Sequence, residues 1–151
     1  MKLLLVLIGA LVTAISTSAG ADWSNPENLS RLPGKTAYAV SDLSENGTRS
    51  IQLAYACDNS RQIYFLLADF PVPTRIKSGV EFAQTELTFD GEAITVNLFP
   101  GVDHLKFGET WAIKDGMVES SLMTIKLDWT DFEIDMTGSA KALFSAYNKC
   151  H

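Results

Sequence analysis

The sequence predicts a mainly β protein, either an antiparallel sandwich or a strongly curved sheet, with a C-terminal helix packed on it. Beyond residue 50, apolar and polar residues alternate with period two along several runs of the chain, which is the pattern of strands with one buried face. Pairs of turn-forming residues, Asp-Gly above all, separate these runs. The apolar period becomes helical only near the C-terminus.

The first two clear strands are expected on either side of the turn Asp58-Asn59-Ser60. Alternate residues from Ile51 to Cys57 fall on one face of the strand before this turn, and residues 62–67 form the strand after it. The clearest hairpin follows, with strands at residues 80–89 and 93–99 around Asp90-Gly91. Asp-Gly supplies the positive φ that a two-residue type I′ turn requires.

A second hairpin is expected around Asp115-Gly116, between strands at residues 105–113 and 118–129. In the later strand, Trp129 is expected to share the inward face with Leu127.

The next strand has the cleanest alternation, with Phe132, Ile134 and Met136 predicted to be inside and Glu133 and Asp135 outside. After this strand, Thr137 or Ser139 is expected to cap a helix from Ala140 to Lys149.

Residues 1–21 have the pattern of a cleavable signal peptide. Lys2 provides the positive charge, Leu3 to Ile15 is almost wholly apolar, and Ala19-Gly20-Ala21 has the small residues that a signal peptidase recognises. The apolar run is shorter than the roughly 20 residues that a permanent membrane helix needs, and no later stretch is apolar enough to span a membrane. We therefore expect export to the periplasm or secretion, as one β-rich domain of residues 22–151.

The charge of the chain restricts its partners. Removal of the signal peptide, whose one charged residue is Lys2, changes the formal charge from −6 to −7. Nucleic acid is not expected as a partner, because binding it requires clustered Lys and Arg. Repulsion likewise disfavours an anionic lipid surface, whereas a basic protein would be attracted.

Cys57 and Cys150 are the two cysteines of the chain. Two thiols of an exported protein normally pair in an oxidising compartment, so we predict a disulfide between them. For a loop of this length the chain-entropy model gives a stabilisation of about 4–5 kcal/mol. The alternative is a reactive thiol, which needs a basic neighbour, whereas Cys57 is followed by Asp58.

The sequence carries no motif that predicts catalysis or a bound cofactor. His104 and His151 are its two histidines, and neither these nor the cysteines have the spacing of a metal site. The chain has no G-x-S-x-G elbow, no S-x-x-K sequence and no glycine-rich phosphate loop. Carboxylates are numerous, but they lie on predicted turns and outward faces, where spacing singles out no catalytic pair. We assign no catalytic residue, metal ligand or cofactor, and an enzyme is not expected.

The segment from Phe70 to Gly79 is the one unusual connection, because two prolines stiffen it. Its second half contains Arg75, Lys77, Ser78 and Gly79, and the two cations place positive charge on an acidic protein. Loops held by a rigid sheet commonly carry binding residues, so these four are the candidate binding residues. The alternative is a plain connection whose prolines prevent strand pairing at a sheet edge.

Two stretches are similar to known families. Leu53-Ala54-Tyr55-Ala56-Cys57, together with residues 132–143 and Cys150, resembles small periplasmic accessory proteins associated with type VI secretion. This resemblance implies a secretion accessory in which a mid-chain cysteine pairs with one after the final helix.

Tyr55-Ala56-Cys57, Ser78-Gly79-Val80-Glu81-Phe82 and the C-terminal cysteine are similar to motifs of bacterial periplasmic inhibitors of c-type lysozyme. That resemblance implies a serine-glycine loop that enters the lysozyme cleft. In the family a lysine beyond the loop also enters the cleft, and this chain has Phe89-Asp90-Gly91 in that region. An acidic inhibitor also complements a basic lysozyme.

These observations favour an exported, non-catalytic envelope protein that binds another macromolecule, most simply another protein, as an inhibitor or a secretion accessory. The alternatives are a structural or assembly accessory without a discrete ligand, and a small-ligand carrier or hydrolase. An inhibitor should present a protruding polar loop, and an accessory an exposed apolar patch. A ligand carrier should have a hollow between sheet and helix lined by Tyr55, Phe65 or Trp111.

Overall fold

The computed structural model describes residues 22–150, and the predicted signal peptide, residues 1–21, lies outside them. In chain order the elements are β1 (Ala37–Val40), β2 (Ser44–Asn46), β3 (Arg49–Asp58), β4 (Arg61–Ala68), β5 (Arg75–Lys77), β6 (Val80–Phe89), β7 (Glu92–Pro100), β8 (Leu105–Phe107), α1 (Thr110–Glu119), β9 (Leu122–Leu127), β10 (Thr130–Asp135) and α2 (Ser139–Asn148). Neither of these helices is both long and apolar enough to cross a membrane.

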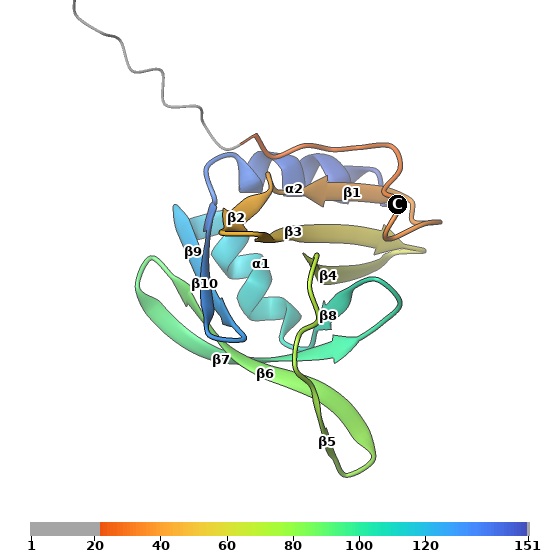
Figure 1. Ribbon diagram of the computed structural model, residues 1–151. Coiled ribbons are helices and arrows are strands. Elements are labelled where there is room, and N and C mark those ends of the chain that lie inside the picture. The colour runs from red at the N-terminus through yellow and green to blue at the C-terminus, as the bar shows by residue number, and fades with distance from the viewer. Residues whose placement is uncertain (1–21, 151) are drawn as a thin grey trace, which may run out of the picture.

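All the strands of the described range belong to one antiparallel sheet, which curves strongly around its concave side (Figure 1). The structure therefore confirms the mainly β fold class and has the curved sheet, not the sandwich. The sheet order is β1-β3-β4-β8-β7-β6-β9-β10, with β2 beside β3 and β5 beside β6. Helix α2 packs on β1 and β3, as expected of a C-terminal helix on the sheet, and it also contacts α1.

The main core lies between the inward faces of the strands and the two helices. Phe132, Ile134 and Met136 are all buried in it, and Glu133 and Asp135 are exposed, so the predicted alternation is confirmed. A smaller cluster covers the other face of β3 and β4, where residues of the N-terminal segment and β1 pack on these strands; it contains Leu32, Tyr38, Val40, Ala54, Ala56, Phe65 and Leu67.

The hairpin predicted around Asp115-Gly116 is wrong, because this pair lies inside helix α1. A Cβ atom on Gly116 would lie 2.3 to 2.5 Å from ring atoms of Phe89. The glycine is needed there for a close contact between helix and strand, not for a turn. The other Asp-Gly pair, Asp90-Gly91, does form the predicted turn, with φ of 49° and 87°.

Two local predictions near the C-terminus are also wrong. Trp129 is 95% exposed instead of inward, because Asp128 and Trp129 form the turn between β9 and β10 with positive φ. Neither Thr137 nor Ser139 caps α2. Its N-cap position is Gly138 in the left-handed conformation, and the Ser139 hydroxyl donates instead to the carbonyl oxygen of Met117.

Cys57 and Cys150 form the predicted disulfide, with their Cα atoms 5.7 Å apart. Both residues are buried. The bond joins β3 to the chain just after α2, so the helix that covers this part of the sheet is held at its C-terminal end by a covalent link.

The two edges of the sheet, at β2 and at β10, are joined by side chains. No backbone ladder connects these two strands in the described range. The Ser44 hydroxyl donates to the carbonyl oxygen of Glu133 at 2.5 Å. The side-chain amide of Asn46 donates to the carbonyl oxygen of Asp131 at 2.7 Å. These two contacts bring the sheet close to a closed ring.

Candidate functional site

The four candidate binding residues lie together at the end of a hairpin that extends from the body of the protein (Figure 1). Arg75 and Lys77 belong to β5, and Ser78 and Gly79 form the two-residue turn between β5 and β6. Both turn residues have positive φ, 53° and 78°, as in the type I′ turns that connect tightly paired strands. The segment is therefore an ordered hairpin arm, although β5 is too short for alternation to reveal it in the sequence.

The hairpin projects from the sheet because the ladder between β6 and β7 does not include the first three residues of β6. Their ladder starts with Ala83 opposite Leu98, and the same register would place Glu81 opposite Pro100. Proline has no N–H to donate to a ladder. On its other edge β7 continues to pair with β8, with Pro100 opposite Leu105. The first three residues of β6 are consequently paired with β5 alone.

The hairpin has two different faces. Arg75 lies opposite Phe82 and Lys77 lies opposite Val80, and residues directly opposite each other in an antiparallel pair point to the same side. One face therefore combines two cations with apolar side chains. The opposite face carries Ile76, which is 75% exposed.

Arg75 is held in position on the first face. Its guanidinium donates from Nη2 to Oε1 of Gln84 at 2.7 Å, and its Cζ atom lies 5.1 Å from the ring centroid of Phe82. Neither Phe82 nor Gln84 is among the site residues predicted from the sequence. Their even spacing from Val80 places them on the same face of β6 as Val80. This matters for the site only once residues 75–77 are known to form the strand beside it.

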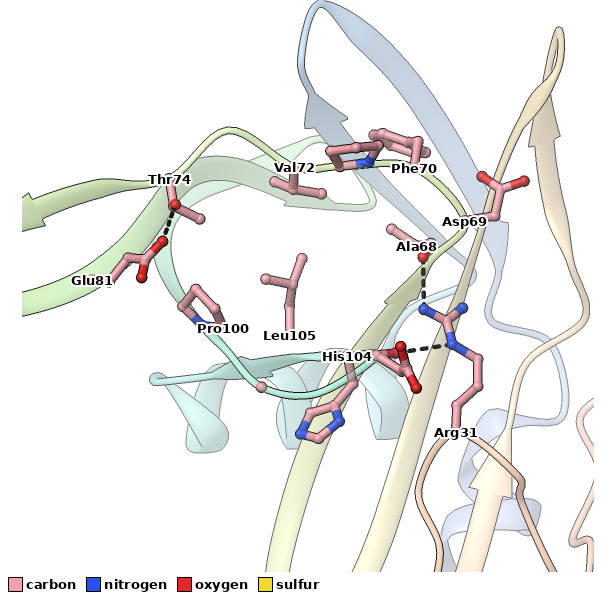
Figure 2. Close-up of a pocket in the computed structure, with 13 residues that line it drawn as sticks. Arg31, Ala68, Asp69, Phe70, Val72, Thr74, Glu81, Pro100, His104 and Leu105 are labelled. Carbon is pink, nitrogen blue, oxygen red and sulfur yellow. Dashed lines mark hydrogen bonds between the residues drawn. The ribbon is translucent and has the colours of Figure 1, made fainter.

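A hollow of about 670 Å³ lies at the base of the hairpin, between residues 69–74 and the turn from β7 to β8 (Figure 2). Its polar groups bond mainly to one another. Arg31 donates from Nη2 to the carbonyl oxygen of Ala68 at 2.7 Å and from Nε to that of Asp103 at 2.9 Å. The Thr74 hydroxyl donates to Oε1 of Glu81 at 2.5 Å. These bonds tie the rim of the hollow together.

The titratable side chains Asp69 and His104 point away from this opening (Figure 2). The Asp69 carboxylate accepts the backbone N–H of Ser50 at 2.7 Å, and this hydrogen bond lowers the pKa of Asp69. The His104 ring packs edge-on against Phe65, with 5.0 Å between ring centroids. Between residues 22 and 150, no three His, Cys, Asp or Glu side chains come together in a way that could hold a metal ion.

The three residues expected around the hollow of a ligand carrier do not lie together. Tyr55 is fully buried in the main core, and Phe65 belongs to the smaller cluster on the other face of the sheet. Trp111 is 69% exposed on α1, beside an open hollow of about 410 Å³. The structure therefore has no hollow lined by these three residues together in the described range.

Comparison of the chain with models of protein families, with curated proteins and with solved structures finds no match.

Proposed function

We propose that the protein is an exported, non-catalytic envelope protein, periplasmic or secreted, that binds another protein through the β5–β6 hairpin. The observation that carries the proposal is the exposure of this hairpin, where Ile76 is 75% and Val80 is 50% exposed. Side chains in this position do not belong to the core. Apolar groups exposed next to charged ones on a projecting element are typical of a surface that a partner covers.

Two features support export. The Cys57–Cys150 disulfide is compatible with an oxidising compartment. The signal-peptide pattern of residues 1–21 supplies the route, and the exported chain would begin at Asp22.

The test is affinity capture from an envelope extract by the exported protein, followed by mass spectrometry of what is retained. Arg75→Glu combined with Lys77→Glu should weaken capture of the partner at least tenfold. The matched control is Lys141→Glu with Lys149→Glu, which makes the same charge change on and beside α2, on the side of the molecule away from the hairpin. Both variants should melt close to the wild-type temperature, because exposed charges contribute little to stability.

Equal capture by the wild type and the hairpin variant would contradict the proposal, since the binding surface would then lie elsewhere. Equal loss in the hairpin and control variants would indicate a general charge effect and also count against it. Failure of the wild type to retain any partner would favour a structural accessory without a discrete ligand.

A second candidate follows from the position of Ser78 and Gly79 at the tip of the hairpin. The lysozyme-inhibitor resemblance requires an accessible serine-glycine loop, and this tip is accessible. If the protein is such an inhibitor, it should slow hydrolysis of cell walls by c-type lysozyme, and Ser78→Trp should abolish the effect by obstructing the tip. Unchanged lysozyme activity in the presence of the wild-type protein would rule this candidate out.

A further inference from the structure

Positive charge gathers on one part of the surface although the chain is acidic. Two hollows of about 350 and 520 Å³ share Phe99 in their walls; Lys77 and Phe82 line the first, and Arg61 and Lys106 line the second. Neither wall contains an Asp or Glu, in a chain with 18 of them against 12 Lys and Arg. The hollows at the base of the hairpin and beside α1 each include several carboxylates.

The strand register explains why these residues share a face. Phe99 lies opposite Lys106 in the β7–β8 ladder, and Lys106 lies opposite Phe65 in the β8–β4 ladder. Arg61 is an even number of positions from Phe65 along β4, so it points to the same side.

The same face continues from β7 into the hairpin. Asn97, two residues before Phe99, lies opposite Gln84 in β6. Phe82, two residues before Gln84, lies opposite Arg75. We call the six residues Arg61, Arg75, Lys77, Phe82, Phe99 and Lys106 the basic face; they cross five neighbouring strands, in the order β4, β8, β7, β6 and β5.

The charges of the basic face are available to a partner. Its four cations are all exposed. The ion pairs in the described part of the chain involve Lys35, Arg49 and Lys126 instead. Arg75 is bonded to the neutral amide of Gln84, so its positive charge is not compensated there. Asp58 lies opposite Arg61 in the β3–β4 ladder, but its ion pair is with Lys35. An anionic group placed on this face would therefore meet cations without breaking any of these three ion pairs.

We propose that the basic face binds an extended segment of a partner protein in which acidic and apolar residues are interspersed. This inference rests on the proposed function and specifies its partner. Five neighbouring strands span roughly 19 Å at the usual strand spacing, which is the length of about six residues of extended chain. The cations pair with the acidic residues, and Phe82, Phe99 and the half-exposed Val80 contact the apolar ones.

Other anionic partners fit this surface less well. A polyphosphate or another polyanion without apolar groups would leave the aromatic rings of Phe82 and Phe99 without apolar contacts. A broad anionic bilayer would also approach the carboxylates that give the chain its net charge of −6. The net charge alone favours a basic partner, but the local arrangement at the hairpin favours an acidic one.

The test uses a fluorescent 12-residue peptide of repeated Asp-Val-Ser, titrated with the exported protein and followed by fluorescence anisotropy. Binding is expected, and it should weaken as salt is added. Arg61→Glu with Lys106→Glu should weaken it at least tenfold, whereas the Lys141→Glu with Lys149→Glu control should bind as the wild type does. A matched peptide with Lys in place of Asp should not bind.

In the titration, three results would overturn the inference: no binding of the acidic peptide, equal binding of the Lys peptide, or tighter binding of a heparin fragment of the same charge. A concentration-dependent dimer in sedimentation that the Arg61 and Lys106 changes abolish would also overturn it, because a second copy would then be the occupant. The two proposals remain separable in the capture assay. Suppose that the Arg75 and Lys77 variant loses capture while the Arg61 and Lys106 variant captures fully. The hairpin would then remain the proposed binding site, and the proposal for the basic face would be contradicted.

Discussion

The guanidinium of Arg75 lies over the ring of Phe82, its direct partner across the β5–β6 ladder, with 5.1 Å between Cζ and the ring centroid. A planar guanidinium stacks on an aromatic ring in a way that an ammonium group does not. Arg75→Lys keeps the charge but loses the stacking and the bond to Gln84. We expect this change to weaken binding of the partner or of the acidic peptide about three- to tenfold.

The matched control for that prediction is Lys77→Arg, which also keeps the charge and should bind at least as well as the wild type. The measurement is the same anisotropy titration. Indistinguishable affinities for wild type and Arg75→Lys would show that charge alone matters at this position.

The alternation that runs through β10 and on to Met136 predicts opposite outcomes for two nearby substitutions. Met136 is 2% exposed, and Met136→Lys would bury a charge without a partner, so unfolding should require less free energy by about 3 kcal/mol or more. Glu133 is exposed, and Glu133→Lys should change stability by no more than about 0.5 kcal/mol. Urea denaturation measures both, and equal losses would mean that the strand buries both faces.

Gly116 provides a test of the contact between α1 and β6. Alanine is ordinarily better than glycine inside a helix by about 1 kcal/mol. At this position, however, the added Cβ would lie as close as 2.3 Å to Phe89, so Gly116→Ala should lower the melting temperature instead. Phe89→Leu should partly restore the stability of Gly116→Ala by making room. A more stable Gly116→Ala single variant would contradict the close contact.

The disulfide and the processing site are checked together by intact mass. The exported protein should have the mass of a chain that begins at Asp22 and lacks two hydrogens. Reduction should lower the stability by about 4–5 kcal/mol, because it releases a long loop in the unfolded chain. A retained Met1, or two thiols that react with an alkylating reagent in the unreduced, unfolded protein, would contradict this prediction.

Two buried tyrosines predict a loss of stability at high pH. The pKa of Tyr55 is raised to about 12, mainly by burial and to a smaller extent by the neighbouring Tyr147. Burial also raises the pKa of Tyr64. An unfolded tyrosine ionises near pH 10. The stability due to Tyr55 is therefore fully present below pH 10 and is lost as the pH rises toward 12, since the unfolded chain releases a proton that the folded chain retains.

Tyr55→Phe should accordingly move the midpoint of alkaline unfolding to higher pH. At pH 7 the same change should leave the free energy of unfolding the same or larger, because the buried Tyr55 hydroxyl has no hydrogen-bond partner in the described range. Urea denaturation at pH 7 and at pH 11 tests both statements. A large loss of stability at pH 7 would show that the hydroxyl is bonded after all.

The successes and failures of sequence analysis have physical reasons. The alternation at Phe132, Ile134 and Met136 was predictable because the strand buries one face only. Apolar residues therefore mark the buried face and charged residues the exposed one. Asp90-Gly91 and Asp115-Gly116 are the same dipeptide. The second pair lies inside α1, where Gly116 allows a close contact with Phe89, and this contact joins distant parts of the chain.

The candidate site was predictable in part for a similar reason. Arg75, Lys77, Ser78 and Gly79 are close in sequence, and they proved to be close in space. The rest of the basic face depends on the pairing of β4 with β8, which are not consecutive in the chain. Arg61, Phe99 and Lys106 become neighbours only through strand register, which no local pattern specifies.

The disulfide described above also makes the chain a covalent ring with a short tail. Cys57 and Cys150 are 93 positions apart, and only residues 22–56 of the described chain precede the ring. An unfolding motor that threads a protein from its N-terminus through a narrow pore would meet the ring after this tail and would then have to admit two strands at once. While the bond is oxidised, the β5–β6 hairpin lies within the ring, so a motor that admits only one strand would stop before reaching it.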